Sequence, residues 1–260
     1  MKLDCFQVDA FAERVFEGNP AAVVPLQDWP EDGLLQAIAM ENNLSETAFF
    51  VPEADDFHLR WFTPKAEVAL CGHATLAAAH VLYDALGYNR DSVRFLSRSG
   101  PLTVRRAGAG YSMDFPALPS TSMVIPDDLI DGLCGCEAAT VLSGQDVLVV
   151  LEQESDVAEL QPDLSALARL DGRGVVVTAR GAEHDFVSRC FFPKLGVPED
   201  PVTGSAHCQL APWWAQRLGR TRLKARQLSA RGGTLGCQVR DDRVELLGQA
   251  VTFLRGSIQL

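Results

Sequence analysis

Three short segments of the sequence contain residue types that move or hold protons. Glu46 lies in NLSETAFF, His73 in LCGHAT and Asp200 in EDPVTGSAH. Carboxylates and imidazoles are the side chains most often used for general acid–base catalysis, because their pKa values can be tuned towards neutrality. We therefore take Glu46 and His73 as candidate catalytic residues for a proton-transfer reaction, whereas Asp200 could cap the helix that follows or hold a charged group of the substrate.

The sequence around Glu46 is apolar, with Leu44 before it and Ala48, Phe49 and Phe50 after it. Removing a carboxylate from water raises its pKa. We therefore expect Glu46 to be partly protonated near neutral pH, so that it can act as both acid and base. The alternative is a solvated glutamate at the start of a strand.

Two of the three segments have a glycine at the start of a predicted helix. Gly72 begins the helix expected over residues 72–87, and Gly204, followed by Ser205, begins the helix expected up to residue 219. A helix N-terminus has unpaired amides and a partial positive charge, and glycine lets a ligand approach the backbone. These helix starts are suited to binding a carboxylate or to stabilising an enolate next to one.

Cys71 stands immediately before the first helix start, where the pKa of a thiol can fall. The alternative is an unreactive buried cysteine. A metal site made of Cys71, His73, His207 and Cys208 fits no zinc spacing, so we expect no metal. A hydrolytic pair of Ser205 and His207 is also disfavoured, because residues two apart on a helix do not face each other.

The two helix starts belong to an internal repeat with an offset of 132 residues. Without any gap, the segment of residues 67–100 matches Glu67 to Glu199, Gly72 to Gly204 and Gly87 to Gly219. The matched positions include a helix start, a helix end and the strand that follows. The sequence therefore predicts two halves of similar build, with LCGHAT and VTGSAH in equivalent positions.

Composition excludes several classes of function. The net charge of −11 and the lack of a basic face argue against nucleic-acid binding. No apolar run approaches the ~18 residues that span a bilayer, so we expect no membrane association. The odd count of seven cysteines and the absence of a signal peptide are typical of a reducing cytoplasm.

The remaining pattern consists of short apolar runs separated by glycine and proline turns, which predicts many strands and few helices. Residues 117–140, rich in Pro, Ser and Asp, are expected to connect the two halves. Pro212 lies within the second central helix, where it removes a hydrogen bond. We therefore expect that helix to kink or to split in two, and the first central helix to be unbroken.

The sequence resembles the phenazine-biosynthesis PhzF-like family, within the diaminopimelate epimerase-like fold. The resemblance rests on segments spread over nearly the whole chain, VDAF…FEGNPAAVV, NLSETAFF, RWFTPKAEVALCGHATLA, DFVSRCFFPKLGVPEDPVTGSAH and LSARGG. It implies an α+β fold of two pseudo-symmetric domains, each a curved β-sheet or barrel wrapped round a central helix. It also implies a homodimer, no cofactor and an active site in the cleft between domains. We expect domains over residues 1–118 and 119–250, with a strand at 251–260 that completes the first.

The resemblance also implies roles for particular residues. It makes Glu46 the acid and base of an isomerisation, assisted by His73 and Asp200. Substrate binding would fall to the helix starts and to two residues in the other matching segments, namely Gly72, Gly204, Ser205, Asn19 and Ser45.

The sequence departs from the parent epimerases at one position. Those enzymes carry a cysteine at each helix start, whereas here Cys71 is matched by Thr203. A threonine hydroxyl is too weak an acid to replace a thiol. We therefore expect an isomerase that moves a proton on a small carboxylated substrate with one carboxylate. The alternatives are an amino-acid epimerase that pairs Glu46 with Cys71, and a carboxylate-binding protein without turnover.

Overall fold

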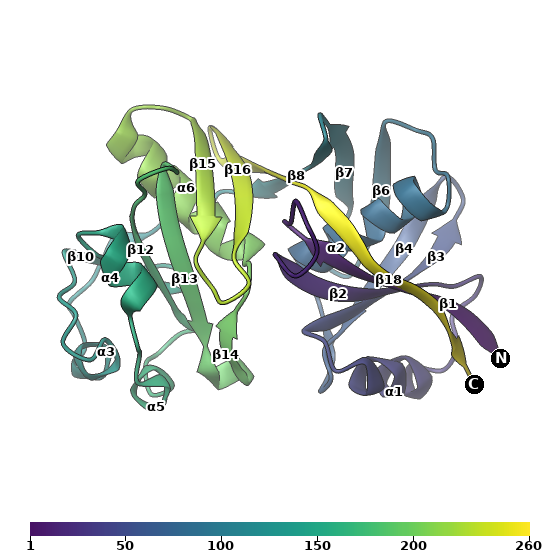
Figure 1. Ribbon diagram of the computed structural model, residues 1–260, viewed down its shortest axis with the longest axis horizontal. Helices are drawn as coiled ribbons and strands as arrows, with labels where there is room; N and C mark the ends of the chain where they lie inside the picture. The colour runs from purple at the N-terminus through teal and green to yellow at the C-terminus, as the bar shows by residue number, and fades with distance from the viewer. The chain divides into compact units, whose positions relative to one another are not determined.

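The computed structural model describes residues 1–260, and the chain forms two compact units (Figure 1). The N-terminal unit contains Met1–Asp114 and Leu247–Leu260, and the C-terminal unit contains Phe115–Leu246. The chain therefore changes unit after Asp114 and again after Leu246. The sequence predicts these transitions after residues 118 and 250. Both units combine a sheet with helices, so the predicted mixed α+β class is confirmed.

The N-terminal unit is a strongly curved sheet. Hydrogen-bonded neighbours follow the order β18–β1–β2–β3–β4–β6–β7–β8, in which β2–β3 and β4–β6 are parallel and the other pairs antiparallel. The strands are β1 (Lys2–Ala10), β2 (Asn19–Pro25), β3 (Glu46–Glu53), β4 (Asp56–Phe62), β5 (Glu67–Val68), β6 (Ser92–Leu96), β7 (Leu102–Ala107), β8 (Gly110–Pro116) and β18 (Ala250–Gln259).

The centre of this unit is the helix α2 (Gly72–His80), which contacts β1, β2, β3, β7 and β18. Every residue of α2 after Gly72 is buried, and four of them are alanines that let the strands approach on all sides. The helical path expected from Gly72 towards Gly87 runs without interruption to Ala85, but its last part is not α-helical. After His80 the chain continues as a wider π-helical turn, Val81–Ala85, in which the Leu86 amide donates to the Val81 carbonyl.

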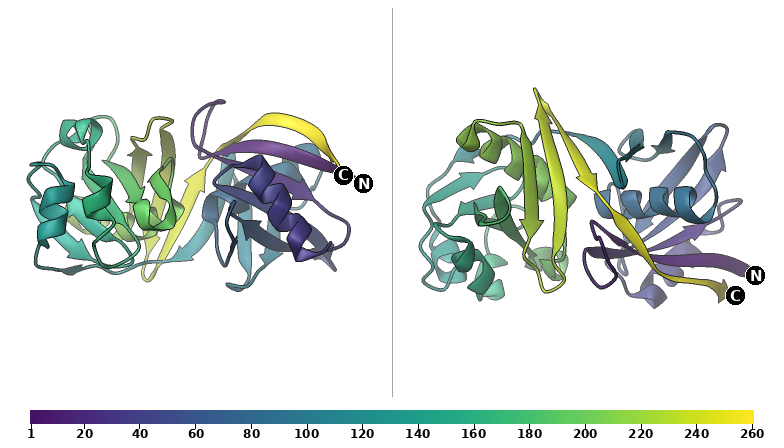
Figure 2. Two further views of the ribbon diagram at one scale, coloured as in Figure 1. Left: turned by 90° about the horizontal axis from the view of Figure 1, so that it is seen from below. Right: turned by 45° about the horizontal axis from the view of Figure 1, so that its top comes forward.

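The helix α1 (Asp32–Asn42) lies against the other face of the same sheet (Figure 2). Its apolar residues Leu35 and Ile38 pack onto Phe49 and Phe62, whose rings meet edge to face. The helix ends at Asn43, which takes a left-handed conformation with φ of 48°. This packing fixes the position of β3 and of Glu46, its first residue.

The C-terminal unit repeats this order of pairing. Antiparallel and parallel pairs alternate along its strands β10–β11–β12–β13–β15–β16. The order of these pairs is the same as along β1–β2–β3–β4–β6–β7. Its elements are β9 (Thr121–Ser122), α3 (Asp127–Gly132), β10 (Thr140–Ser143), β11 (Val147–Val150), α4 (Glu154–Glu159), α5 (Leu164–Leu167), β12 (Val175–Arg180), β13 (Phe186–Phe192), a 3-10 turn (Pro193–Leu195), β14 (Val197–Asp200), α6 (Gly204–Leu218), β15 (Arg222–Gln227), β16 (Gly233–Arg240) and β17 (Arg243–Gly248).

The helix α6 is continuous through Pro212, so the expectation that it splits in two is wrong. Proline at this position deprives the Cys208 carbonyl of its helical partner. The backbone amide of Leu118, from the segment that enters the C-terminal unit, donates to that carbonyl at 3.0 Å. The missing hydrogen bond is thus replaced from outside the helix, and the helix continues to Leu218.

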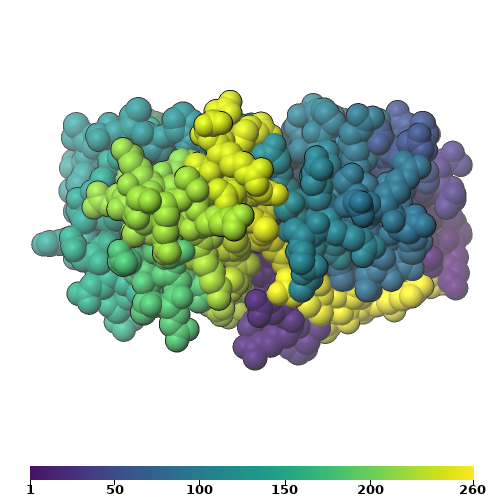
Figure 3. All heavy atoms as spheres, turned by 90° about the horizontal axis from the view of Figure 1, so that it is seen from above, coloured from purple at the N-terminus to yellow at the C-terminus, as the bar shows by residue number.

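The last strand, β18, pairs with β1 along its whole length, from Lys2 opposite Gln259 to Ala10 opposite Ala250. Both chain ends therefore lie in the N-terminal unit. The C-terminal residues form a band at its surface (Figure 3), in which Phe253 and Leu254 are exposed. No helix in the protein has both the length and the apolarity needed to cross a membrane.

Candidate active site

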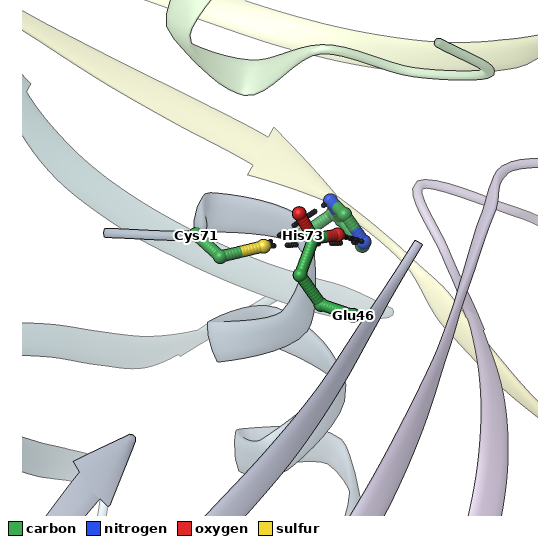
Figure 4. Close-up of side chains that lie close together, drawn as sticks. All are labelled: Glu46, Cys71 and His73. Carbon is green, nitrogen blue, oxygen red and sulfur yellow. Dashed lines mark hydrogen bonds and ion pairs between the residues drawn. The ribbon is translucent and has the colours of Figure 1, made fainter. Parts of the chain in front are cut away.

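The N-terminal unit brings Glu46, Cys71 and His73 together (Figure 4). Cys71 Sγ lies 3.5 Å from His73 Nδ1, and Nε2 of the same ring lies 3.2 Å from Glu46 Oε2. The imidazole therefore stands between a thiol and a carboxylate. The contact between Nε2 and Oε2 is within ion-pair distance but is not aligned as a hydrogen bond.

The local fold explains why these three side chains meet. Glu46 is the first residue of β3 and lies opposite Ala21 in the parallel pairing with β2. Cys71 is extended, with φ of −146°, and its carbonyl accepts from both the amide and the hydroxyl of Thr75, at 3.1 and 2.6 Å. These two bonds fix the first turn of α2, and His73 projects from that turn towards Glu46.

The arrangement makes Glu46 and His73 a buried ion pair. Burial raises the pKa of Glu46, but the positive charge of His73 and the close polar contacts with His73 and Cys71 outweigh it, so the pKa is lowered. Burial lowers the pKa of His73, but the neighbouring Cys71 and Glu46 raise it well above its ordinary value. The expectation of a raised Glu46 pKa is therefore wrong, since the imidazole offsets the apolar neighbours.

Cys71 does not have the low pKa that a helix start can give a thiol. Its pKa rises to about 11, first because the side chain is buried and second because the Glu46 carboxylate is close. The site at rest thus holds a protonated thiol, an imidazolium and a carboxylate. Strongly perturbed, mutually dependent pKa values of this kind are typical of functional sites.

The other residues predicted for this unit lie beside the cluster in sequence and in the sheet. Gly72 is the first residue of α2, between Cys71 and His73. Asn19 is the fully buried first residue of β2, and Ser45 is the half-buried residue before β3. Their part in substrate binding stays a prediction.

In the C-terminal unit, Asp200 and Thr203 form the loop that leads into α6. The Thr203 hydroxyl donates to Asp200 Oδ2 at 2.5 Å. The buried side chain of Gln227 bridges the two ends of this loop. Its Nε2 donates to the Asp200 backbone carbonyl at 2.6 Å, and its Oε1 accepts from the Thr203 backbone amide at 2.8 Å. Thr203, at the position of the second epimerase cysteine, is thus a hydrogen-bonding residue that orients Asp200.

Ser205 and Gly204 form the first turn of α6, as predicted. The partner of Ser205 was not predicted: Arg173 Nη2 donates to Ser205 Oγ at 2.9 Å. Arg173 also forms a two-bond ion pair with Asp146, at 2.8 and 2.6 Å. Sequence reasoning missed Arg173 and Asp146 because neither lies in a motif, and both are more than thirty residues from Ser205.

His207 serves neither the hydrolytic pair nor the metal set considered from the sequence. Its Nδ1 lies 2.8 Å from the Thr203 carbonyl, and burial lowers its pKa to about 4. Its ring is therefore neutral and tied to the backbone one turn earlier. The set of metal-binding residue types with adjacent ligand atoms is a different one, Glu46, Cys71 and His73, whose atoms lie within 4.8 Å of one another.

Comparison with known proteins agrees with this description. Residues 8–256 match the sequence profile of the phenazine biosynthesis-like protein family. An uncharacterized isomerase of Pseudomonas aeruginosa is 55% identical over 260 residues, which cover all of both chains. The crystal structure of a PhzF-family protein of Enterococcus faecalis matches with a TM-score of 0.98 at 48% identity, again over both whole chains. A probable proline racemase of Agrobacterium radiobacter, at 11% identity and a TM-score of 0.67 over 99% of this chain and 92% of that one, shares the fold.

Proposed function

Since the chain belongs to the phenazine biosynthesis-like protein family, we propose that it is an isomerase that moves a proton within a small carboxylated substrate, without a cofactor. Relatives named as isomerases support the class of reaction. The observation that carries the mechanism is the buried ion pair of Glu46 and His73. It supplies a base and an acid that are both in the required protonation state near neutral pH.

In the proposed mechanism, Glu46 is the proton carrier. Its ionised carboxylate removes a proton from a carbon of the substrate, and the electron pair of that C–H bond becomes an enolate or a dienolate. His73, as imidazolium, stabilises the negative charge. Protonated Glu46 then delivers a proton to another carbon, so that the atoms of substrate and product balance.

The substrate carboxylate is assigned to the start of α6. Gly204 and Ser205 offer backbone amides and a hydroxyl there, and both are partly exposed. Asp200, held by Thr203 and Gln227, is proposed to bind a positively charged or hydroxyl group of the substrate.

The proposal is tested by incubating the purified protein with a panel of small unsaturated carboxylates in deuterated water. An isomerase of this kind incorporates deuterium at carbon, because the proton on Glu46 exchanges with solvent between removal and return. Mass spectrometry detects the incorporated deuterium. A protein that binds members of the panel but catalyses no exchange with any of them would be the carboxylate-binding protein named above.

An amino-acid epimerase that pairs Glu46 with Cys71 is the second candidate. It is favoured by one observation, the protonated Cys71 thiol 3.5 Å from the His73 ring. The two candidates differ in whether the thiol takes part in proton transfer.

Replacing Cys71 with serine separates them. Under the one-carboxylate mechanism, the variant keeps its exchange rate within about threefold, because the hydroxyl replaces the thiol as a neighbour of His73. Under the epimerase mechanism the rate falls by about 10²-fold or more, since serine is a far weaker acid. Steady-state exchange rates of wild type and variant decide between these outcomes, and Cys5→Ser, at a half-buried cysteine in β1, is the control.

Chelation tests whether Glu46, Cys71 and His73 hold a metal. Their donor types are acceptable to zinc, but two of them carry protons at rest, which a metal would have to displace. We expect dialysis against EDTA to leave the exchange rate unchanged and added Zn²⁺ not to increase it. A rate that falls on chelation and returns with Zn²⁺ would assign the three residues to a metal site.

A further inference from the structure

We propose that Arg173 is a positioning residue that turns the hydroxyl of Ser205 into a hydrogen-bond donor, and so makes the start of α6 select a carboxylate over an uncharged amide. The inference rests on the proposed function, because it concerns the group that holds the substrate. It goes beyond the residues that the family resemblance implies, since neither Arg173 nor its partner Asp146 is among them.

The Arg173 guanidinium has a fixed position. Asp146, whose side chain has 0% exposure, accepts from Nε and Nη2, while Arg173 keeps 29% exposure. The ring of Phe192 lies 5.0 Å below the guanidinium carbon. A planar guanidinium held by two bonds and stacked on a ring has one orientation, which lysine cannot reproduce.

The ion pair of Arg173 and Asp146 is also attached to the helix that carries Ser205. Gln209, on α6 and also buried, donates from Nε2 to the Asp146 carbonyl at 3.0 Å and accepts from the Asp146 amide at 3.2 Å. Asp146 is therefore fixed to α6 itself. Helix, carboxylate and guanidinium form one rigid group that presents Ser205.

The contact with Arg173 also limits the direction of the Ser205 hydroxyl hydrogen. A serine oxygen has two lone pairs and one hydrogen. Arg173 Nη2 donates to this oxygen and has no lone pair, so it can only be a donor. The Ser205 hydrogen must point elsewhere, and it is available for a group that accepts hydrogen bonds.

The groups at the start of α6 are hydrogen-bond donors, which favours a negatively charged ligand. The three bonds of Arg173 use Nε and Nη2 and leave Nη1 outside them. The Ser205 hydroxyl, the helix N-terminus and Nη1 are all donors. A ligand group that only accepts, such as a carboxylate, satisfies them, whereas an amide brings donors of its own.

The experiment compares benzoate with benzamide, which have similar shape but differ in charge and in N–H donors. Chemical shifts of the Gly204 and Ser205 amides report binding at this helix. For wild type we expect benzoate to bind more tightly than benzamide. In Arg173→Lys we expect the dissociation constant for benzoate to rise about 10- to 100-fold and that for benzamide to change little.

Arg189→Lys is the matched control. Arg189 forms an equivalent two-bond pair with Glu199 and stacks on Phe191 in the same unit, but it does not touch Ser205. We expect it to keep the preference for benzoate. If Arg173→Lys does not fold, Ser205→Ala replaces it, because it leaves the pair of Arg173 and Asp146 in place and is expected to lose the same preference.

In the binding experiment, two outcomes overturn the inference. In the first, benzoate does not shift the Gly204 and Ser205 amides of the wild-type protein. In the second, Arg173→Lys prefers benzoate over benzamide as strongly as Arg189→Lys does. The deuterium-exchange screen is scored separately. Binding that depends on Arg173 in a protein that exchanges no substrate would refute the isomerase and keep this inference. An exchange rate that does not change in Arg173→Lys would refute this inference and keep the isomerase.

Discussion

Replacing Glu46 with glutamine is expected to lower the rate of deuterium exchange about 10²- to 10⁴-fold, the usual range for loss of a general base. Glutamine has the shape of glutamate and keeps an oxygen that accepts hydrogen bonds, but it cannot take a proton. The side chain begins β3 beside a well-packed core, so the fold is expected to remain. Binding of benzoate, assigned to α6, should change less than threefold. Exchange rates by mass spectrometry and binding by amide chemical shifts give the two measurements.

The control for this variant is Glu67→Gln. Glu67 is another partly buried carboxylate of the N-terminal unit, but it pairs with Arg60 through two bonds of 2.8 and 2.9 Å and not with His73. It is expected to exchange at close to the wild-type rate. Exchange that continues undiminished in Glu46→Gln would show that another group is the base, and would remove the central assignment of the proposed function.

The architecture was predictable because the two units share local pattern as well as topology. The offset of 132 residues carries α2 onto α6, and it carries β6 and β7 onto β15 and β16. The parallel pair β4–β6 becomes the parallel pair β13–β15. Helix starts at glycine and tight glycine turns, at residues 108–110 and 232–233, are local signals, so sequence alone could locate them.

The irregularities of the two central helices were not predictable in the same way. Pro212 is a local signal for a broken helix, yet the Leu118 amide supplies the bond that the Cys208 carbonyl lacks. Leu118 is 94 residues before Pro212 in sequence, so no window around Pro212 contains the compensating group. The π-helical turn in the other unit contains no proline or glycine from which it could have been predicted.

The pKa values in the candidate site also depend on groups that are distant in sequence. The residues that neighbour Glu46 in sequence are apolar and suggest a raised pKa. The group that decides the outcome is His73, 27 residues later, brought within 3.2 Å by the packing of α2 inside the sheet. For Cys71 the order is reversed: the helix start suggests a lower pKa, and burial with Glu46 nearby raises it. Residue types could be predicted from sequence, whereas their charge states required the fold.

His73→Gln is expected to move the acidic limb of the pH–rate profile upwards. In wild type the active form needs ionised Glu46 and protonated His73. Its rate is therefore present above the lowered pKa of Glu46, below 4.5, and is lost as pH rises through the raised pKa of His73, above 6.5. Without the imidazolium, burial of Glu46 dominates and its pKa rises above 4.5. The acidic limb should then shift to higher pH, and the basic limb that His73 causes should vanish.

The matched control is His80→Gln, at a second buried histidine of the same helix. His80 bonds to Tyr111 and Thr252, and its pKa is lowered by burial, so it does not determine the charge of Glu46. Its profile should keep the wild-type limbs even if the rate falls through lost stability. Profiles of kcat/KM against pH for the three proteins provide the comparison. An acidic limb that stays in place in His73→Gln would mean that the imidazolium does not hold Glu46 ionised, and the ion pair could no longer account for catalysis near neutral pH.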